Sequence, residues 1–194
     1  DHDFHDYLET LHIVREPHTE WFHADGRTLL GHFHDFAMRA LPRTQEHTTY
    51  ELRREQADAV QMTADYFKNG GTEFLWNAKP RFGKTLTSYD LIRRMGFTKV
   101  LIVTNRPSIA NSWAEDFHRF IGWRGALAFV SDTEALRGRE GVLTREAYTS
   151  LPTMEDVGMV AFESLQGLKG SVYFGGEYDK LRWISELEFD LLIV

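Results

Sequence analysis

The sequence predicts an α/β domain built around a parallel β-sheet. Five mainly apolar runs lie at residues 73–77, 99–104, 126–130, 157–162 and 189–194. Strands that are apolar throughout, rather than at alternate positions, are typical of a parallel sheet buried on both faces. Between these runs lie segments whose apolar residues recur at helical spacing, and such alternation indicates an α/β fold with flanking helices.

Four helices are expected among these runs. The first extends from about Arg53 to Phe67 and is closed by Asn69-Gly70-Gly71, a glycine-rich stop. The second is KTLTSYDLIRRM, which ends at Gly96. The remaining two are expected at residues 108–121 and 178–187. The run 73–77, EFLWN, comes between the first two helices and is predicted to be a strand.

The domain organisation is predicted to be a short, mainly helical N-terminal extension over residues 1–46, or the tail of an upstream domain, followed by a domain over 47–194. The sequence LPRTQEHTT is interpreted as the linker between them. The chain opens on Asp1 and closes on the apolar run FDLLIV. A buried parallel strand is a poor place for a natural terminus, so we expect a fragment of a longer polypeptide.

One helix is predicted within the extension, from Leu29 to Leu41, because Leu30, Phe33, Ala37 and Ala40 recur at helical spacing. We interpret it as a helix that docks on the following domain. The aromatic pair ahead of it, Trp21 and Phe22, is expected to anchor this packing.

Histidines crowd the extension, since eight of the nine lie in the first 47 residues. Within GHFHD, the side chains of His32, His34 and Asp35 could approach a metal ion. Two ligands at i and i+2 diverge on a helix, however, and no second pair is spaced to meet them. Exposed or partly packed histidines are therefore the favoured interpretation.

The amino-acid composition excludes several classes of protein. The chain has 194 residues, 42% hydrophobic and 26% charged, which is ordinary for a globular protein. It has no cysteine, and therefore neither disulfides nor thiolate metal sites, and no apolar run long enough to span a membrane. The first residues, DHDFHDYLET, have neither the basic start nor the apolar stretch of a signal peptide. We expect a cytoplasmic location and no membrane partner.

The net charge of −7 argues against a general polyanion-binding surface. Residues 1–50 hold nine acidic and four basic side chains, whereas residues 51–194 hold 20 and 18. The second part can therefore carry a local basic strip that contacts phosphates, which the first cannot easily do.

The loop AKPRFGKT, residues 78–85, carries the strongest functional signal. In a phosphate-binding loop, backbone N–H groups and a helix N-terminus face the phosphates, a lysine reaches the β- and γ-phosphate oxygens, and a hydroxyl ligates Mg²⁺. Gly83 lets the backbone approach closely, while Lys84 and Thr85 open the following helix. The alternative is a lysine that caps an ordinary turn between a strand and a helix.

Three residues of this loop depart from the usual pattern. Ala78 stands where a first glycine is common, and Arg81 and Phe82 fill a place that is normally small and flexible. Pro80 fixes its own φ and biases Lys79 toward an extended conformation. The Arg81 side chain either faces the γ-phosphate or points into solvent, and exposure is the default for a loop arginine.

Four segments together resemble a known family. LRREQADAV, AKPRFGKT, VLIVTNRPSIANSW and FDLLIV are similar, in order and spacing, to the adenine-reading Q motif, motif I, motif Ia and the strand before the DEAD/DEAH box of superfamily 2 helicases. The nearest subgroup is the motor subunits of type III and type I restriction-modification systems. The resemblance covers about residues 50–194 and implies the first RecA-like P-loop domain of a helicase or translocase.

The resemblance implies ATP and Mg²⁺ as cofactors. It assigns Arg53 and Gln56 to adenine, Lys84 to the β- and γ-phosphates, and Thr85 to the Mg²⁺ ion. The rest of the loop would complete the nucleotide site, through Lys79, Arg81, Phe82 and Gly83. A buried structural amide remains the alternative for Gln56.

Two further segments would contact nucleic acid in this family. The first is Thr104, Asn105 and Arg106, whose side chains suit phosphate contact without base reading. Their alternative is loop and helix capping, with Ser108 or Asn111 as local partners. The second is AFESLQGLKGS, with Ser164, Gln166 and Lys169, for which a plain surface loop is the alternative.

The implied parent protein is an ATP-dependent DNA translocase or helicase, with double-stranded DNA as its track. Its partners would be a second RecA-like domain and an upstream domain of the same chain, and a methyltransferase or specificity subunit. The acidic pair of the DEAD/DEAH box is absent, so residues 1–194 alone are expected to be inactive in hydrolysis. An RNA helicase and a non-catalytic nucleotide-regulated scaffold remain the alternatives.

Overall fold

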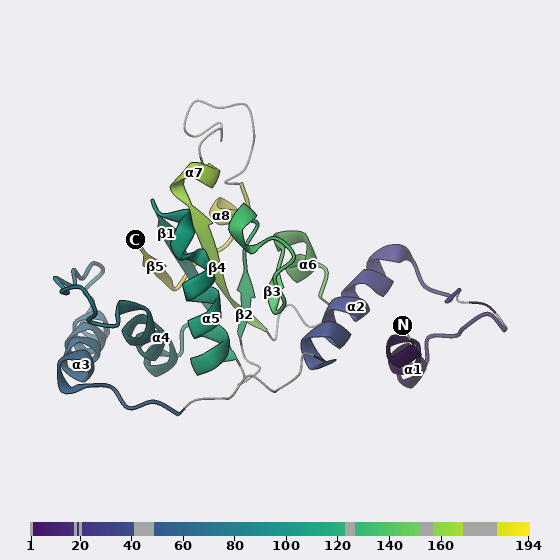
Figure 1. Cartoon of the computed structure of the whole chain (residues 1–194), viewed down its shortest axis with the longest axis horizontal. Helices are drawn as coiled ribbons and strands as arrows, with labels where there is room; N and C mark the ends of the chain where they lie inside the picture. Colours follow the sequence, from purple (N-terminus) through teal and green to yellow (C-terminus); the bar gives the residue numbers. More distant parts are fainter. Residues whose placement is uncertain are drawn as a thin grey trace.

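A computed structural model describes residues 2–17, 19, 21–40, 49–122, 127–151, 157–168 and 182–194. Its centre is a sheet in the order β3-β2-β4-β1-β5, in which every pairing is parallel (Figure 1). The strands are β1 (Lys99–Thr104), β2 (Leu127–Val130), β3 (Val142–Leu143), β4 (Gly158–Ser164) and β5 (Leu191–Ile193). The predicted α/β class is confirmed.

The register brings two strand ends together. β1 pairs with β4 along the whole length of β1, from Lys99 beside Met159 to Thr104 beside Ser164. β5 pairs with the other edge of β1. Because all strands are parallel, the loops after β1 and β4 emerge next to each other at the carboxyl edge of the sheet.

One face of the sheet is covered by α4 (Lys84–Met95) and α5 (Ala110–Phe120), and α5 continues a short 3₁₀ turn, η1 (Pro107–Ile109). Tyr89, Trp113 and Phe117 form the aromatic centre of this layer, and each is almost fully buried. The predicted helix at 108–121 is therefore present, with a 3₁₀ first turn set by the proline at its start.

The opposite face carries two short helices, α6 (Arg145–Thr149) and α8 (Arg182–Glu186). On β4, Val160 and Phe162 point into the first layer, whereas Met159 and Ala161 point into the second. Both faces of this strand are buried, which explains why its sequence is apolar without alternation. Two short elements complete the connections, η3 (Glu134–Leu136) and α7 (Leu165–Leu168).

α3 (Arg54–Lys68) packs against α4 rather than against the sheet, through Val60, Ala64 and Leu91. It ends at Lys68 with Asn69 as its C-cap, and the following Gly70 has φ +88°. This geometry matches the predicted glycine-rich stop.

The prediction of a strand at 73–77 is wrong. The segment between Gly71 and Lys79 contains no strand, and its fixed point is Trp76, whose indole Nε1 donates to Thr63 Oγ1 on α3 (2.7 Å). Leu75 is 88% exposed. A strand exists only when a neighbour pairs with it, and no described residue pairs with this segment.

The N-terminal part forms two helices, α1 (His2–Thr10) and α2 (Gly26–Ala40). They pack through Phe4, whose ring lies 5.2 Å from that of Phe33. Asp25 accepts hydrogen bonds from the Thr28 hydroxyl and from the backbone N–H groups of Thr28 and Arg27, and these bonds lower its pKa. This cap starts α2 at Gly26, three residues before the predicted Leu29.

α2 contacts α6, so this helix does reach the sheet domain. Phe22 packs against the rings of His5 and the guanidinium of Arg15, but Trp21 is 78% exposed, so the prediction that Trp21 anchors the segment is wrong. In the part of the chain that the structure describes, no helix is both long and apolar enough to cross a membrane.

Candidate functional site

The loop that leads into α4 has the shape of an anion-binding turn. Gly83 adopts a left-handed conformation (φ +86°) and α4 begins at Lys84 without a side-chain cap. The N–H groups of the first helical turn therefore have no side-chain acceptor, and they point along the helix axis toward the loop. A negatively charged group placed there would be stabilised by these N–H groups and by the helix dipole.

Arg81 takes the conformation that a glycine would take, with φ +64°. The left-handed region costs a non-glycine residue about 1–2 kcal/mol. The loop therefore keeps its turn despite the departure from the usual glycine, at the expense of local strain. The Arg81 side chain is exposed.

Lys84 and Thr85 lie at the start of α4, as predicted from the motif. Lys84 Nζ donates to the carbonyl of Ala78 (3.3 Å), which folds the ammonium group back over the loop. Thr85 is half-buried beside it. Lys79 is exposed, and its carbonyl accepts a hydrogen bond from the Phe82 N–H (3.2 Å), which closes the turn.

Arg53 and Gln56 both hold the loop from the start of α3. The Gln56 amide nitrogen donates to the Phe82 carbonyl (2.8 Å), and the Arg53 guanidinium donates to the same oxygen (2.5 Å) and to the Arg81 carbonyl (3.3 Å). The Gln56 amide oxygen accepts from the Arg53 backbone N–H (2.8 Å). Gln56 is 4% exposed.

These bonds match the structural alternative considered for Gln56, because both ends of its amide serve the protein. An amide nitrogen carries a second hydrogen and an amide oxygen a second lone pair, so one donor and one acceptor remain. Contact of Arg53 and Gln56 with adenine stays a prediction.

A large cavity adjoins the loop. It measures ≈1150 Å³, and Lys84 and Thr85 line one end of it. Its walls are the segment at 71–76, α3, α4, α5, the carboxyl end of β1 and all of β5, and they are mostly apolar. Lys84 and Thr85 therefore lie in the wall of a cavity rather than on a flat surface.

The second predicted group lies at the carboxyl edge of the sheet, where β1 and β4 end side by side. Thr104 Oγ1 accepts from the Arg106 N–H (3.1 Å), and Ser164 Oγ accepts from the Gly167 N–H (3.0 Å). Gln166 Nε2 donates to the Asn105 carbonyl (2.7 Å). The two hydroxyls therefore cap their own loops, and the glutamine ties the loops together.

The Arg106 guanidinium and the Asn105 amide are exposed at this edge. They are the groups best placed to contact a phosphate, because the two hydroxyls already serve the backbone. Lys169, the last of the predicted residues, lies outside the described residues.

The described residues give no support to a metal site in the N-terminal extension. Among the described residues no three His, Asp or Glu side chains gather as a metal site. His32 is half-buried, and its Nδ1 has no hydrogen-bond partner. The side chains of His34 and Asp35 are outside the described set.

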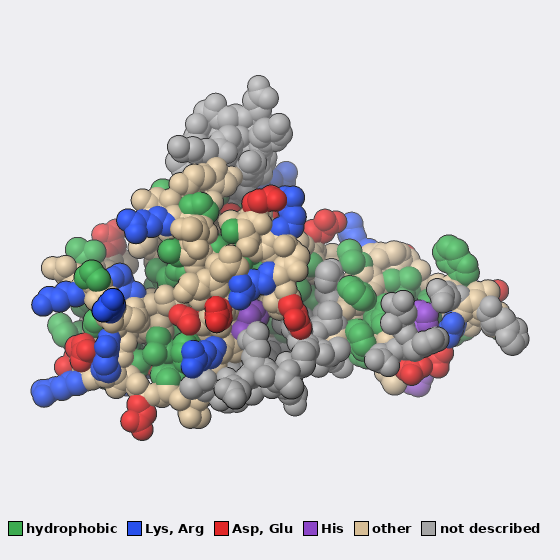
Figure 2. All heavy atoms as spheres, in the orientation of Figure 1, with side chains coloured by type: hydrophobic (Ala, Val, Ile, Leu, Met, Phe, Trp, Pro, Cys, Tyr) green, Lys and Arg blue, Asp and Glu red, His purple; other side chains and the backbone are tan. Residues whose placement is uncertain are grey.

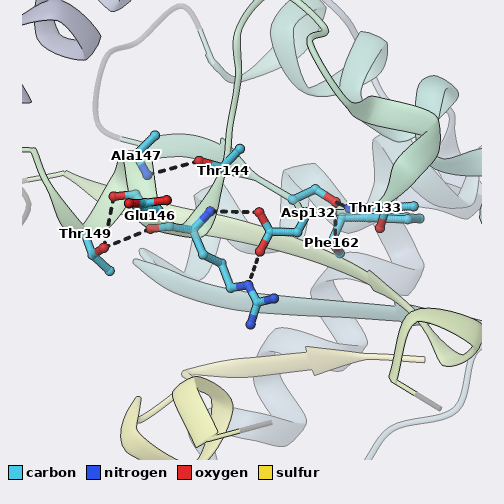
Figure 3. A network of polar contacts seen from close by, with 9 residues as sticks. Asp132, Thr133, Thr144, Glu146, Ala147, Thr149 and Phe162 are labelled. Atoms are coloured by element: carbon cyan, nitrogen blue, oxygen red, sulfur yellow. Dashed lines mark hydrogen bonds and ion pairs between the residues drawn. The ribbon is translucent and has the colours of Figure 1, made fainter. Parts of the chain in front are cut away.

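A polar cluster lies where β2 and β3 end (Figure 3). The Asp132 carboxylate accepts from the Arg145 backbone N–H (3.2 Å) and pairs with its guanidinium, which lies 5.0 Å from the Trp183 ring. Thr144 caps α6 by accepting from the Ala147 N–H (3.1 Å). Because Asp132 balances the charge of Arg145, the cluster is explained as structural and we assign no ligand to it.

Sequence reasoning missed three residues that join the segment before α3 to α4. Tyr50 O–H donates to the Asp90 carboxylate on α4 (2.9 Å), and Arg93 donates to the same oxygen (2.8 Å). Tyr50 and Asp90 are 40 positions apart, and no local pattern connects them.

The face shown in Figure 2 carries no single basic patch, because acidic and basic side chains are interspersed over it. This agrees with the near balance of charges over residues 51–194. The described residues on this face therefore form no extended basic surface for nucleic acid. Phosphate contact at the carboxyl edge of the sheet would depend on individual side chains.

A parallel sheet with helices on both faces, and a glycine-lysine-threonine turn at the start of a helix, define the class: this is an α/β domain of the RecA-like type. A family model described as "Type III restriction enzyme, res subunit" matches residues 49–176. The chain belongs to this family. It is a helicase-like domain of the restriction-system type.

One relative is a protein of Mycoplasma pneumoniae described as a type II restriction enzyme and methyltransferase, C-terminus. It is 29% identical over 154 residues, which cover 74% of this chain. The chain spans only 19% of the length of that relative. No solved structure matches the chain.

Proposed function

We propose that this chain binds Mg·ATP and is the first motor domain of a DNA translocase or helicase in a restriction-type system. The observation that carries the proposal is the loop before α4, where Gly83 turns left-handed, the helix start is uncapped, and Lys84 lies over the loop. These features support the proposal, because phosphate groups are bound by the free N–H groups of a helix start together with a lysine ammonium group.

The donor set fits the nucleotide. Lys84 would move from the Ala78 carbonyl to the phosphates, an exchange that breaks only one hydrogen bond of 3.3 Å. Thr85 would supply a hydroxyl to the Mg²⁺ ion, and the ion would neutralise phosphate charge. Arg81, exposed beside them, adds a second cation that could reach the phosphates.

The track is proposed to be DNA, because the described relative is a restriction enzyme and methyltransferase. Arg106 and Asn105 would contact the phosphate backbone at the carboxyl edge of the sheet, which matches sequence-independent movement. A second RecA-like domain, an upstream domain and a methyltransferase subunit are the proposed partners in the whole protein.

A fluorescent, non-hydrolysed ATP analogue with Mg²⁺ tests the nucleotide site. Binding should be saturable in the wild-type chain and lost in Lys84→Ala. Lys68→Ala is the matched control, because Lys68 is an exposed lysine at the far end of α3 and its removal changes the net charge equally.

Equal binding by wild type and Lys84→Ala would contradict the proposal. Absence of binding in both the chain and its full-length parent would favour a scaffold whose loop has lost nucleotide.

A further inference from the structure

The segment just before α3 is fastened to α4 at a buried carboxylate. Asp90 lies in the middle of α4 with its side chain 6% exposed. Its Oδ1 accepts the Tyr50 hydroxyl (2.9 Å) and the Arg93 guanidinium (2.8 Å). A buried carboxylate needs such partners, because without them its desolvation is costly.

Tyr50 is held in this position on its other side as well. Its ring lies edge-on to Phe120 at the end of α5, with centroids 5.4 Å apart. Burial, and then the hydrogen bond to Asp90, raise the pKa of the Tyr50 hydroxyl, so that it stays protonated and donates at neutral pH.

Three residues after Tyr50, the same segment reaches the loop. Arg53 and Gln56 donate to the Phe82 carbonyl, immediately before the first turn of α4. The segment at 50–56 is therefore hydrogen-bonded at two points, to the Phe82 carbonyl in the loop before α4 and to the Asp90 carboxylate within α4.

We propose that Tyr50 and Asp90 are positioning residues for the nucleotide loop, and that they fix the segment whose Arg53 and Gln56 hold the Phe82 carbonyl. The inference rests on the proposed ATP site, because it concerns the shape of that loop. Neither side chain would touch the nucleotide. Their effect would be to hold the loop in its binding conformation before the ligand arrives, which reduces the entropic cost of binding.

Tyr89 provides a control for a buried tyrosine hydroxyl that stabilises the fold without hydrogen-bonding to the segment at 50–56. Tyr89, adjacent to Asp90, is fully buried and donates to the Trp113 carbonyl (2.7 Å). This bond joins α4 to α5 and does not involve the segment at 50–56. Tyr89→Phe therefore removes a tyrosine hydroxyl from the same helix without releasing the loop.

The experiment compares Tyr50→Phe, Asp90→Asn and Tyr89→Phe with wild type. The dissociation constant of the fluorescent ATP analogue with Mg²⁺, the melting temperature and the amide hydrogen exchange of residues 82–85 are measured for each. Tyr50→Phe and Asp90→Asn should weaken binding roughly five-fold, the effect of losing about one hydrogen bond. They should also speed exchange at 82–85, whereas Tyr89→Phe should lower the melting temperature only.

Wild-type affinity and wild-type exchange at 82–85 in Tyr50→Phe would overturn the inference. Equal weakening in Tyr50→Phe and Tyr89→Phe would also overturn it, since the effect would then be general loss of stability. Lys84→Ala in the same titration separates the two proposals. If neither wild type nor any variant binds nucleotide, but amide exchange at 82–85 still rises only in Tyr50→Phe and Asp90→Asn, the positioning role stands and the proposed ATP site is wrong.

Discussion

Replacing Gly83 by alanine tests the contact between α3 and the loop. Gly83 has φ +86°, and a Cβ added there would lie 2.6 Å from the Gln56 amide nitrogen. That amide cannot easily yield, because it is buried and bonded at both ends. Gly70 has nearly the same φ, +88°, but a Cβ there meets nothing within 4 Å. Gly70→Ala is therefore a control for backbone strain alone.

The expected magnitudes differ accordingly. Gly70→Ala should destabilise by about 1–2 kcal/mol, the cost of a left-handed alanine. Gly83→Ala should have the same strain. It should also break the hydrogen bond from Gln56 to the Phe82 carbonyl, which adds a cost of about 1–3 kcal/mol for a buried group. In a chain of this length each kcal/mol corresponds to roughly 2–4 °C in melting temperature.

Urea denaturation and thermal melting of the two variants and wild type measure this difference. The reasoning requires Gly83→Ala to be clearly less stable than Gly70→Ala, and to bind the ATP analogue more weakly. Equal destabilisation of the two variants would refute it, because Gln56 would then have room to move and would not be holding the loop.

Two other predictions concern the edges of the sheet. Asp190 accepts hydrogen bonds from the Thr98 and Lys99 N–H groups; burial would raise its pKa, but these bonds lower it below the ordinary value of 3.8. Its stabilising effect is thus present above pH 3.8 and lost as the pH falls through the folded-state value. Asp190→Asn should therefore reduce the stability by about 1 kcal/mol at pH 7. The difference in melting temperature between the variant and wild type should shrink in acid. A difference unchanged between pH 7 and pH 2 would contradict this assignment. Arg106→Ala should weaken DNA binding by the full-length protein and reduce the slope of log affinity against log salt by about 1, whereas Arg54→Ala, which removes a 95% exposed guanidinium on α3, should leave that slope unchanged. Equal slopes in Arg106→Ala and wild type would remove Arg106 from the interface.

The elements that the sequence predicted correctly are those whose signal is local. β1 was expected at residues 99–104 and has those bounds, because an apolar run of six residues suits a central parallel strand. α4 likewise follows its helical periodicity and ends where Gly96 turns left-handed. β3, with two residues, and α6, with five, are too short to give a periodic signal and were missed.

The failure at EFLWN has a different cause. The run has the composition of a strand, but strand formation depends on a paired neighbour, and a sequence run carries no information about its neighbour. At the site, the positions of Gly83, Lys84 and Thr85 followed from the local motif. The bond from Tyr50 to Asp90 and the bond from Gln56 to the Phe82 carbonyl join residues 40 and 26 positions apart, so only the fold reveals them.

The edge of β5 has a consequence for the behaviour of the protein in solution. Within the described residues, β5 pairs with β1 alone, and Leu192 on it is 57% exposed. A free apolar edge is a template on which a strand of another molecule can add. Repulsion between molecules opposes such association while the net charge is −7, but this charge vanishes near the isoelectric point of about 5.7. Slightly acidic buffers should therefore favour aggregation of concentrated samples, and mildly alkaline buffers of low salt should keep the chain dispersed.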